Sequence, residues 1–137
     1  MKSFEFIKVY DLKNNNHYME DIQNATLKSD KFGLKITNGL FGSNEWWEAI
    51  DRGSIKKYTV EGVITKIFMS GHNDFPEFEV FDGKEKTNWH RLGEDKYYAK
   101  GRRVKIVYVM QEFKKAIDGL AVPKEILEIY IDEGHKG

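Results

Sequence analysis

The sequence contains no cysteine, and this absence excludes several classes of site at once. Without thiols the chain can form no disulfide, no cysteine nucleophile and no Cys-ligated zinc or iron–sulfur site. An excess of charge of either sign is also missing, because 22 Lys and Arg balance 22 Asp and Glu among 137 residues. A wholly basic nucleic-acid-binding protein and an acidic disordered protein are therefore both excluded.

Long apolar runs are absent as well. The longest purely apolar stretch is Ile106–Met110, whereas a membrane-spanning helix needs ~20 apolar residues. Charged residues interrupt the sequence from Lys2 onward, unlike the continuous apolar segment of a secretory signal peptide. We therefore expect a cytoplasmic protein that makes no membrane contact. The content of 40% hydrophobic and 14% aromatic residues is sufficient for a folded core.

Period-2 alternation of apolar and polar residues, which is typical of β-strands, recurs along most of the chain. It is found in residues 4–10, 58–69, 76–81, 87–92, 103–110 and 126–131. Gly62 lies inside the longest of these segments, where an interior glycine indicates a bulge or a sharp bend. The last five segments favour a small OB-like or SH3-like barrel over residues 57–132, and a half-open sheet is the alternative.

The N-terminal part of the chain differs from this barrel segment. Turn-forming residues at 14–16 and 29–31 separate short β-prone segments, so residues 1–42 are predicted to form a β-meander extension. Residues 43–53 are predicted to be one short helix, because Ser43 can cap its first amides and Gly53 can end it. The absence of a linker or a repeat predicts a single domain over residues 1–137.

Several short motifs resemble a pattern seen in a family of small bacterial proteins. They are Phe41-Gly42-Ser43, Glu45-Trp46-Trp47, Pro76-Glu77-Phe78-Glu79, and Trp89 with Arg91. The resemblance covers about residues 39 to 110. It implies that the tryptophan-bearing helix and the barrel occur together, and it implies no particular activity.

The two adjacent tryptophans of the helix are the first candidate binding residues. Neighbouring residues on a helix point about 100° apart, so Trp46 and Trp47 cannot both face the same pocket. We expect one indole to anchor the helix and the other to be partly exposed. An exposed tryptophan is a typical anchor of a protein interface.

A second candidate surface combines bases with aromatic side chains in residues 84–105. Eight Lys and Arg face three acids in this stretch, and its candidate binding residues are Trp89, Arg91, Tyr97, Tyr98, Arg102 and Arg103. Rings and cationic groups together are typical of single-stranded nucleic-acid binding. The alternative is that the rings pack in the barrel and the bases pair with nearby acids.

Catalytic patterns are weak. His72, Asp74, Glu77 and His90 could converge on a metal ion, but their spacing matches no metal motif, and a solvated loop is the favoured interpretation. We predict no metal site and no cofactor. The favoured function is therefore a non-catalytic module that binds a protein partner. Single-stranded nucleic-acid binding is the first alternative, and a metal-assisted hydrolase is the second.

Overall fold

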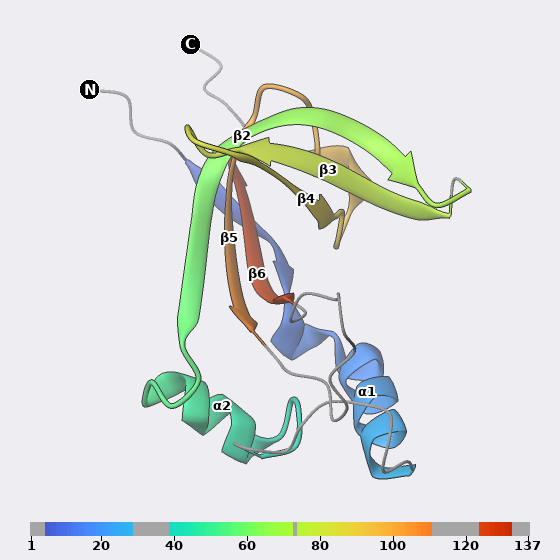
Figure 1. The fold of residues 1–137 in the computed structure, drawn as a ribbon, viewed down its shortest axis with the longest axis vertical. Coiled ribbons are helices and arrows are strands. Elements are labelled where there is room, and N and C mark those ends of the chain that lie inside the picture. Colours follow the sequence, from blue (N-terminus) through green and yellow to red (C-terminus); the bar gives the residue numbers. More distant parts are fainter. Residues whose placement is uncertain (1–4, 29–38, 73, 111–123, 133–137) are drawn as a thin grey trace. The chain divides into compact units, whose positions relative to one another are not determined.

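The computed structural model describes residues 5–28, 39–72, 74–110 and 124–132 (Figure 1). The two α-helices of this part of the chain are α1 (Asn16–Lys28) and α2 (Asn44–Asp51). The strands are β1 (Phe6–Asp11), β2 (Lys57–Ser70), β3 (Phe75–Phe81), β4 (Lys86–His90), β5 (Arg103–Met110) and β6 (Lys124–Asp132). Two short 3-10 turns, η1 (Leu12–Asn14) and η2 (Asp95–Tyr97), complete these elements.

The six strands belong to one antiparallel sheet, with the order β1-β6-β5-β2-β3-β4. This confirms the prediction of a mostly β fold. The order leaves β1 and β4 at the two ends, so no pairing between described strands closes the sheet into a barrel. A barrel-like, OB-like arrangement remains compatible with this sheet.

Helix α1 corrects the predicted N-terminal meander. Residues 16–28 were expected to contain a turn and the start of a hairpin, and they form a helix instead. Met19 and Thr26 are its buried residues, and their separation of seven places both on one helical face. Thr26 is compatible with this position because its hydroxyl donates to the Ile22 carbonyl over 2.7 Å. The other half of the predicted hairpin, at 32–36, lies outside the described residues.

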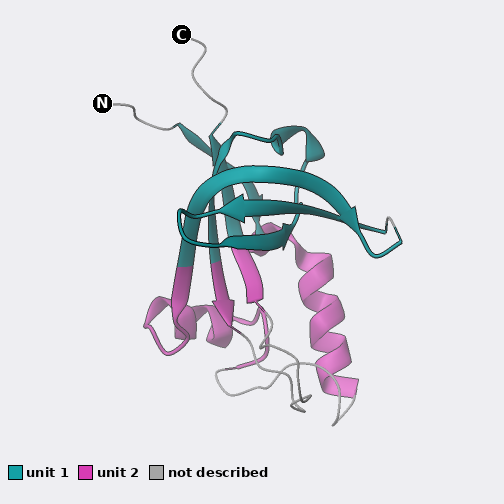
Figure 2. Cartoon of the chain, turned by 45° about the horizontal axis from the view of Figure 1, so that its top comes forward, with its two compact units in different colours: residues 1–11, 59–107, 128–137 teal, residues 12–58, 108–127 magenta. Residues whose placement is uncertain are grey.

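The chain divides into two compact units (Figure 2). Unit 1 comprises residues 1–11, 59–107 and 128–137, and unit 2 comprises residues 12–58 and 108–127. The core of unit 1 is formed by Ile64, Phe78, Val80, Trp89, Tyr98, Val104, Ile106, Ile129 and Ile131. The core of unit 2 contains Leu12, Met19, Phe41, Trp46, Ala49, Ile50, Val109, Ile126 and Leu127. The single domain over residues 1–137 stays a prediction.

Two glycines of unit 1 permit close backbone approaches. A Cβ atom at Gly62 in β2 would lie 2.2 Å from the Phe81 carbonyl oxygen, and the β2–β3 register shifts nearby, between Ile64 and Lys66. Gly93, in the loop after β4, has φ +79° and would place a Cβ 2.2 Å from the Val9 oxygen of β1. The loop that follows β4 therefore lies against β1, although the two strands do not pair.

Candidate protein-binding surfaces

Helix α2 carries the two candidate tryptophans within unit 2. The Ser43 side chain caps the helix by accepting a hydrogen bond from the Trp46 amide over 3.3 Å. Trp46 is only 1% exposed, and its ring centroid lies 4.7 Å from that of Phe41. Trp47 is half-buried, packs edge-on against Trp46 at 4.8 Å, and has the Lys13 ammonium 5.0 Å from its ring. The expected difference in burial is therefore present, and a binding role for either indole stays a prediction.

A half-buried carboxyl group lies near this aromatic cluster. The Tyr18 hydroxyl donates to Glu125 over 2.8 Å, and the Tyr18 ring packs edge-on against Phe41 at 6.0 Å. Burial raises the pKa of Glu125 above its ordinary value, and the hydrogen bond from Tyr18 offsets part of this increase. Glu125 therefore links α1 to β6 and gives this contact a dependence on pH.

The aromatic members of the basic stretch are largely core residues. Trp89 is 5% exposed, and its indole N–H donates to the Thr87 hydroxyl over 2.8 Å. Tyr98 is 7% exposed, packs on Phe78 at 4.9 Å, and donates its hydroxyl to the Leu92 carbonyl. Burial raises the pKa of Tyr98. Neither ring presents a free face on which a nucleotide base could stack.

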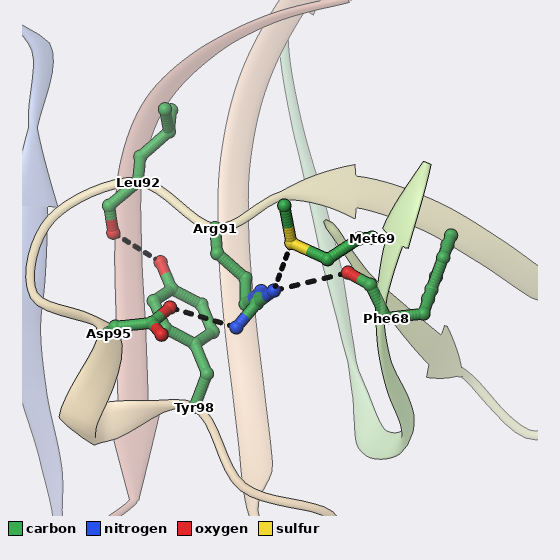
Figure 3. Close-up of polar contacts among 6 residues, drawn as sticks. All are labelled: Phe68, Met69, Arg91, Leu92, Asp95 and Tyr98. Carbon is green, nitrogen blue, oxygen red and sulfur yellow. Dashed lines mark hydrogen bonds and ion pairs between the residues drawn. The ribbon is translucent and has the colours of Figure 1, made fainter. Parts of the chain in front are cut away.

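Arg91 directly follows β4, and its side chain forms hydrogen bonds with two other segments of unit 1 (Figure 3). Its side chain is 9% exposed. One guanidinium nitrogen donates to Asp95 over 2.9 Å, and the other donates to the Phe68 carbonyl over 3.1 Å and to the Met69 sulfur over 3.3 Å. These contacts join the chain after β4 to β2, so most of the hydrogen-bonding capacity of Arg91 is used within unit 1.

The remaining candidates of the basic stretch are half-buried. Arg102 donates to the Tyr97 carbonyl over 3.0 Å, and the Lys96 ammonium lies 5.1 Å from the Tyr97 ring. Arg103 begins β5. The structure therefore brings Arg102 and Tyr97 together, but the two most buried rings of the stretch are enclosed in the core. The binding roles of Arg91, Tyr97, Arg102 and Arg103 stay predictions.

The candidate metal residues do not form a metal site in the described part of the chain. No group of three or more His, Asp and Glu side chains there could hold a metal ion. Glu77 accepts a hydrogen bond from Ser70, while His72 and Asp74 are exposed. The metal-assisted hydrolase therefore has no ligand set among these residues.

Comparison with protein families shows to which family the chain belongs. The family model described as immunity protein RhsI2 matches residues 4–132. The chain belongs to the RhsI2 immunity protein family. The match is more specific than the resemblance expected from the sequence motifs. No curated protein matches the chain.

Membership of the RhsI2 family is consistent with the expected non-catalytic, protein-binding role. Among the described residues, no helix has the length and apolarity needed to cross a membrane. A protein-binding role requires an exposed surface that a partner can cover.

Sequence reasoning missed one such surface, formed by the outer side of β2, β3 and β4. Phe75 is 54% exposed and Phe81 is 40% exposed, and both alternate along β3 with the buried Phe78 and Val80. The alternation of Glu77 and Glu79 with these buried residues was visible in the sequence, and the same period places Phe75 and Phe81 on the outer side. A search for apolar residues at the odd-numbered positions of this strand, which Glu77 and Glu79 also occupy, would have found Phe75 and Phe81.

The acids of this outer side have partners on the neighbouring strands. Glu79 accepts from the Thr65 hydroxyl over 2.9 Å and lies 3.9 Å from the Lys86 ammonium. The adjacent Lys66 ammonium lies 5.0 Å from the Phe68 ring. The outer side of β2–β3–β4 is therefore a mixed surface, with exposed phenylalanines beside partnered charges. Phe75 and Phe81 lie at the two ends of β3 with Glu77 and Glu79 between them, so this surface offers a partner two exposed rings separated by polar groups.

Proposed function

We propose that this chain is an immunity protein that binds a toxin protein and blocks its action without catalysis. The observation that carries the proposal is the match of the RhsI2 immunity protein model to residues 4–132, which is nearly the whole chain. The match extends over both compact units and is not confined to a short motif.

The described surface supports a protein partner better than a nucleic acid. The rings expected to stack on bases, Trp89 and Tyr98, are core residues. Phe75 and Phe81, in contrast, are exposed on a β-sheet, where a partner surface can cover them. Inhibition by binding requires only that the complex cover or distort the toxin's working surface. We further infer that this encounter takes place in the cytoplasm.

Co-expression tests the proposal directly. A candidate toxin, chosen by examining the genes that neighbour the gene of this chain, is expressed in a bacterial host with and without the full chain. We expect growth arrest with the toxin alone, rescue with the chain, and a stable complex of the two purified proteins. Loss of growth despite abundant folded chain, together with no complex, would contradict the proposal. A single-stranded oligonucleotide that binds the chain with a steep salt dependence would instead support the nucleic-acid alternative.

A further inference from the structure

The two ends of the sheet differ in how well they are protected. At one end, the register of β1 against β6 shifts between Lys8 and Tyr10, and Gly93 lies against the Val9 oxygen. A bulge and a covering loop are two common ways in which proteins protect an edge strand. At the other end, the pairing of β4 with β3 shows no register shift from Lys86 to His90. Strand β4, which lies next to β3 (Figure 1), is therefore the regular edge.

The hydrogen-bond phase shows which backbone groups of β4 are available. At one end of the β3–β4 pair the Asp82 amide donates to the Glu85 carbonyl over 3.2 Å, and at the other the Arg91 amide donates to the Pro76 carbonyl over 3.0 Å. Hydrogen-bonded pairs alternate with non-hydrogen-bonded pairs in antiparallel strands. Odd-numbered residues of β4 therefore direct their N–H and C=O groups toward β3.

The even-numbered residues of β4 direct their backbone groups away from β3, and their side chains line the outer side of the sheet. These residues are Lys86, Asn88 and His90, and all three are exposed. The alternate side chains, Thr87 and Trp89, face the opposite side, where Trp89 is buried. Within the described part of the chain, the edge therefore offers a regular set of donors and acceptors, with one exposed polar row and one row formed by Thr87 and the buried Trp89.

We propose that β4 pairs with an extended segment of the toxin, which adds a strand to the sheet. This inference rests on the proposed function, because the toxin supplies the segment. The outer row of β4 contains a lysine and no acid, and the Lys86 side chain is 62% exposed. The Lys86 ammonium lies 3.9 Å from Glu79, a long contact that leaves most of the lysine in solvent, so charge complementarity favours an acidic side chain of the toxin segment beside Lys86.

A proline substitution can test the backbone pairing. Asn88→Pro removes an N–H that points away from β3, so the existing β3–β4 hydrogen bonds are retained. Asn88→Ala is the matched control, because it removes the same side chain and keeps the N–H. We expect Asn88→Pro to weaken binding of the toxin identified by the co-expression test by about 10-fold to 100-fold. Asn88→Ala should stay within about 3-fold of wild type.

Charge reversal tests the chemistry of the toxin segment. Lys86→Glu should weaken the same complex by about 10-fold, since it places like charges opposite each other. Lys100→Glu is the control, because Lys100 is exposed and lies outside β4. An equal loss of affinity in both variants would mean that only the overall charge of the chain matters. That result would overturn the inference that the toxin segment is acidic.

Hydrogen exchange provides a readout that is independent of whether Asn88→Pro folds. In the wild-type complex, the Asn88 and His90 amides should exchange much more slowly than in the free chain. Wild type that binds toxin without protection of these amides would overturn strand addition and leave the proposed function intact. A folded Asn88→Pro variant with wild-type affinity would do the same. Failure of wild type to bind the toxin would instead contradict the proposed function itself.

Discussion

Truncation of the two adjacent indoles should separate their roles in unit 2. Trp46 is 1% exposed and contacts the rings of both Phe41 and Trp47. Removal of a buried aromatic side chain costs about 3–5 kcal/mol, because the lost burial is joined by the cost of a cavity. The free energy of unfolding of a typical domain is only about 5–15 kcal/mol. Trp46→Ala should therefore remove a large part of the stability.

Trp47→Ala should cost less, because the Trp47 indole is half-buried. It loses one edge-on ring contact, worth about 0.5–1.5 kcal/mol, and a cation–π contact with Lys13, worth about 0.5–1 kcal/mol. These contacts add to the apolar burial of part of the indole, so we expect a total loss of about 2–3 kcal/mol, smaller than that of Trp46→Ala.

Urea unfolding followed by circular dichroism provides the assay for both variants. The transition midpoint should fall much further for Trp46→Ala than for Trp47→Ala, at an unchanged slope. Trp46→Phe serves as the control and should recover part of the loss, because it retains a ring against Phe41. Equal losses for the two alanine variants, or a larger loss for Trp47→Ala, would refute the division between a buried anchor and a partly exposed neighbour.

Three further predictions follow from unit 1 and from Glu125. Gly93→Ala should destabilise the protein more than Gly83→Ala in thermal melts, because both have positive φ but only Gly93 would place a Cβ 2.2 Å from a backbone oxygen; equal losses would contradict the clash. Arg91→Ala should cost about 1–3 kcal/mol through its lost buried hydrogen bonds, whereas Asp95→Ala should cost about 0–1 kcal/mol because Asp95 is exposed. Burial raises the folded-state pKa of Glu125, so the folded state binds the carboxyl proton more tightly than the unfolded state does. The stability that this proton contributes is therefore lost as the pH rises above 4.5 and through the folded-state pKa. Glu125→Gln should reduce this loss in unfolding measured from about pH 4, near the ordinary glutamate pKa of about 4.3, to about pH 8, and an unchanged pH profile would contradict the assignment.

The strands and α2 were predictable because their signals are local. Residues 103–110 alternate strongly, and they form β5 over the same range. Ser43 caps α2 as expected from the preference of serine for that position. Helix α1 gave a weaker signal, since its buried residues are only Met19 and Thr26. Asparagines 14–16, read as a turn, instead precede and begin a helix.

The alternation of side chains along β4 also argues against the predicted nucleic-acid surface. Lys86 and Trp89 lie an odd number of residues apart in one strand, so their side chains point to opposite sides of the sheet. Bases and rings that are interleaved in the sequence are therefore separated in space by the strand itself. Composition counted over residues 84–105 could not detect this separation, whereas the period of two could.

The regular edge of β4 could not be inferred from local patterns, because an edge is a property of strand order. Any strand with the pattern of β4 would present one exposed and one more buried row of side chains, whether it lay in the middle of a sheet or at its end. The order β1-β6-β5-β2-β3-β4 depends on pairing between segments far apart in the chain, such as β2 with β5. Only that order leaves the outward backbone groups of β4 without a neighbouring strand among the described elements. A side-chain search of the sequence therefore finds anchors such as Trp46, while a site made by the backbone becomes visible only in the folded sheet.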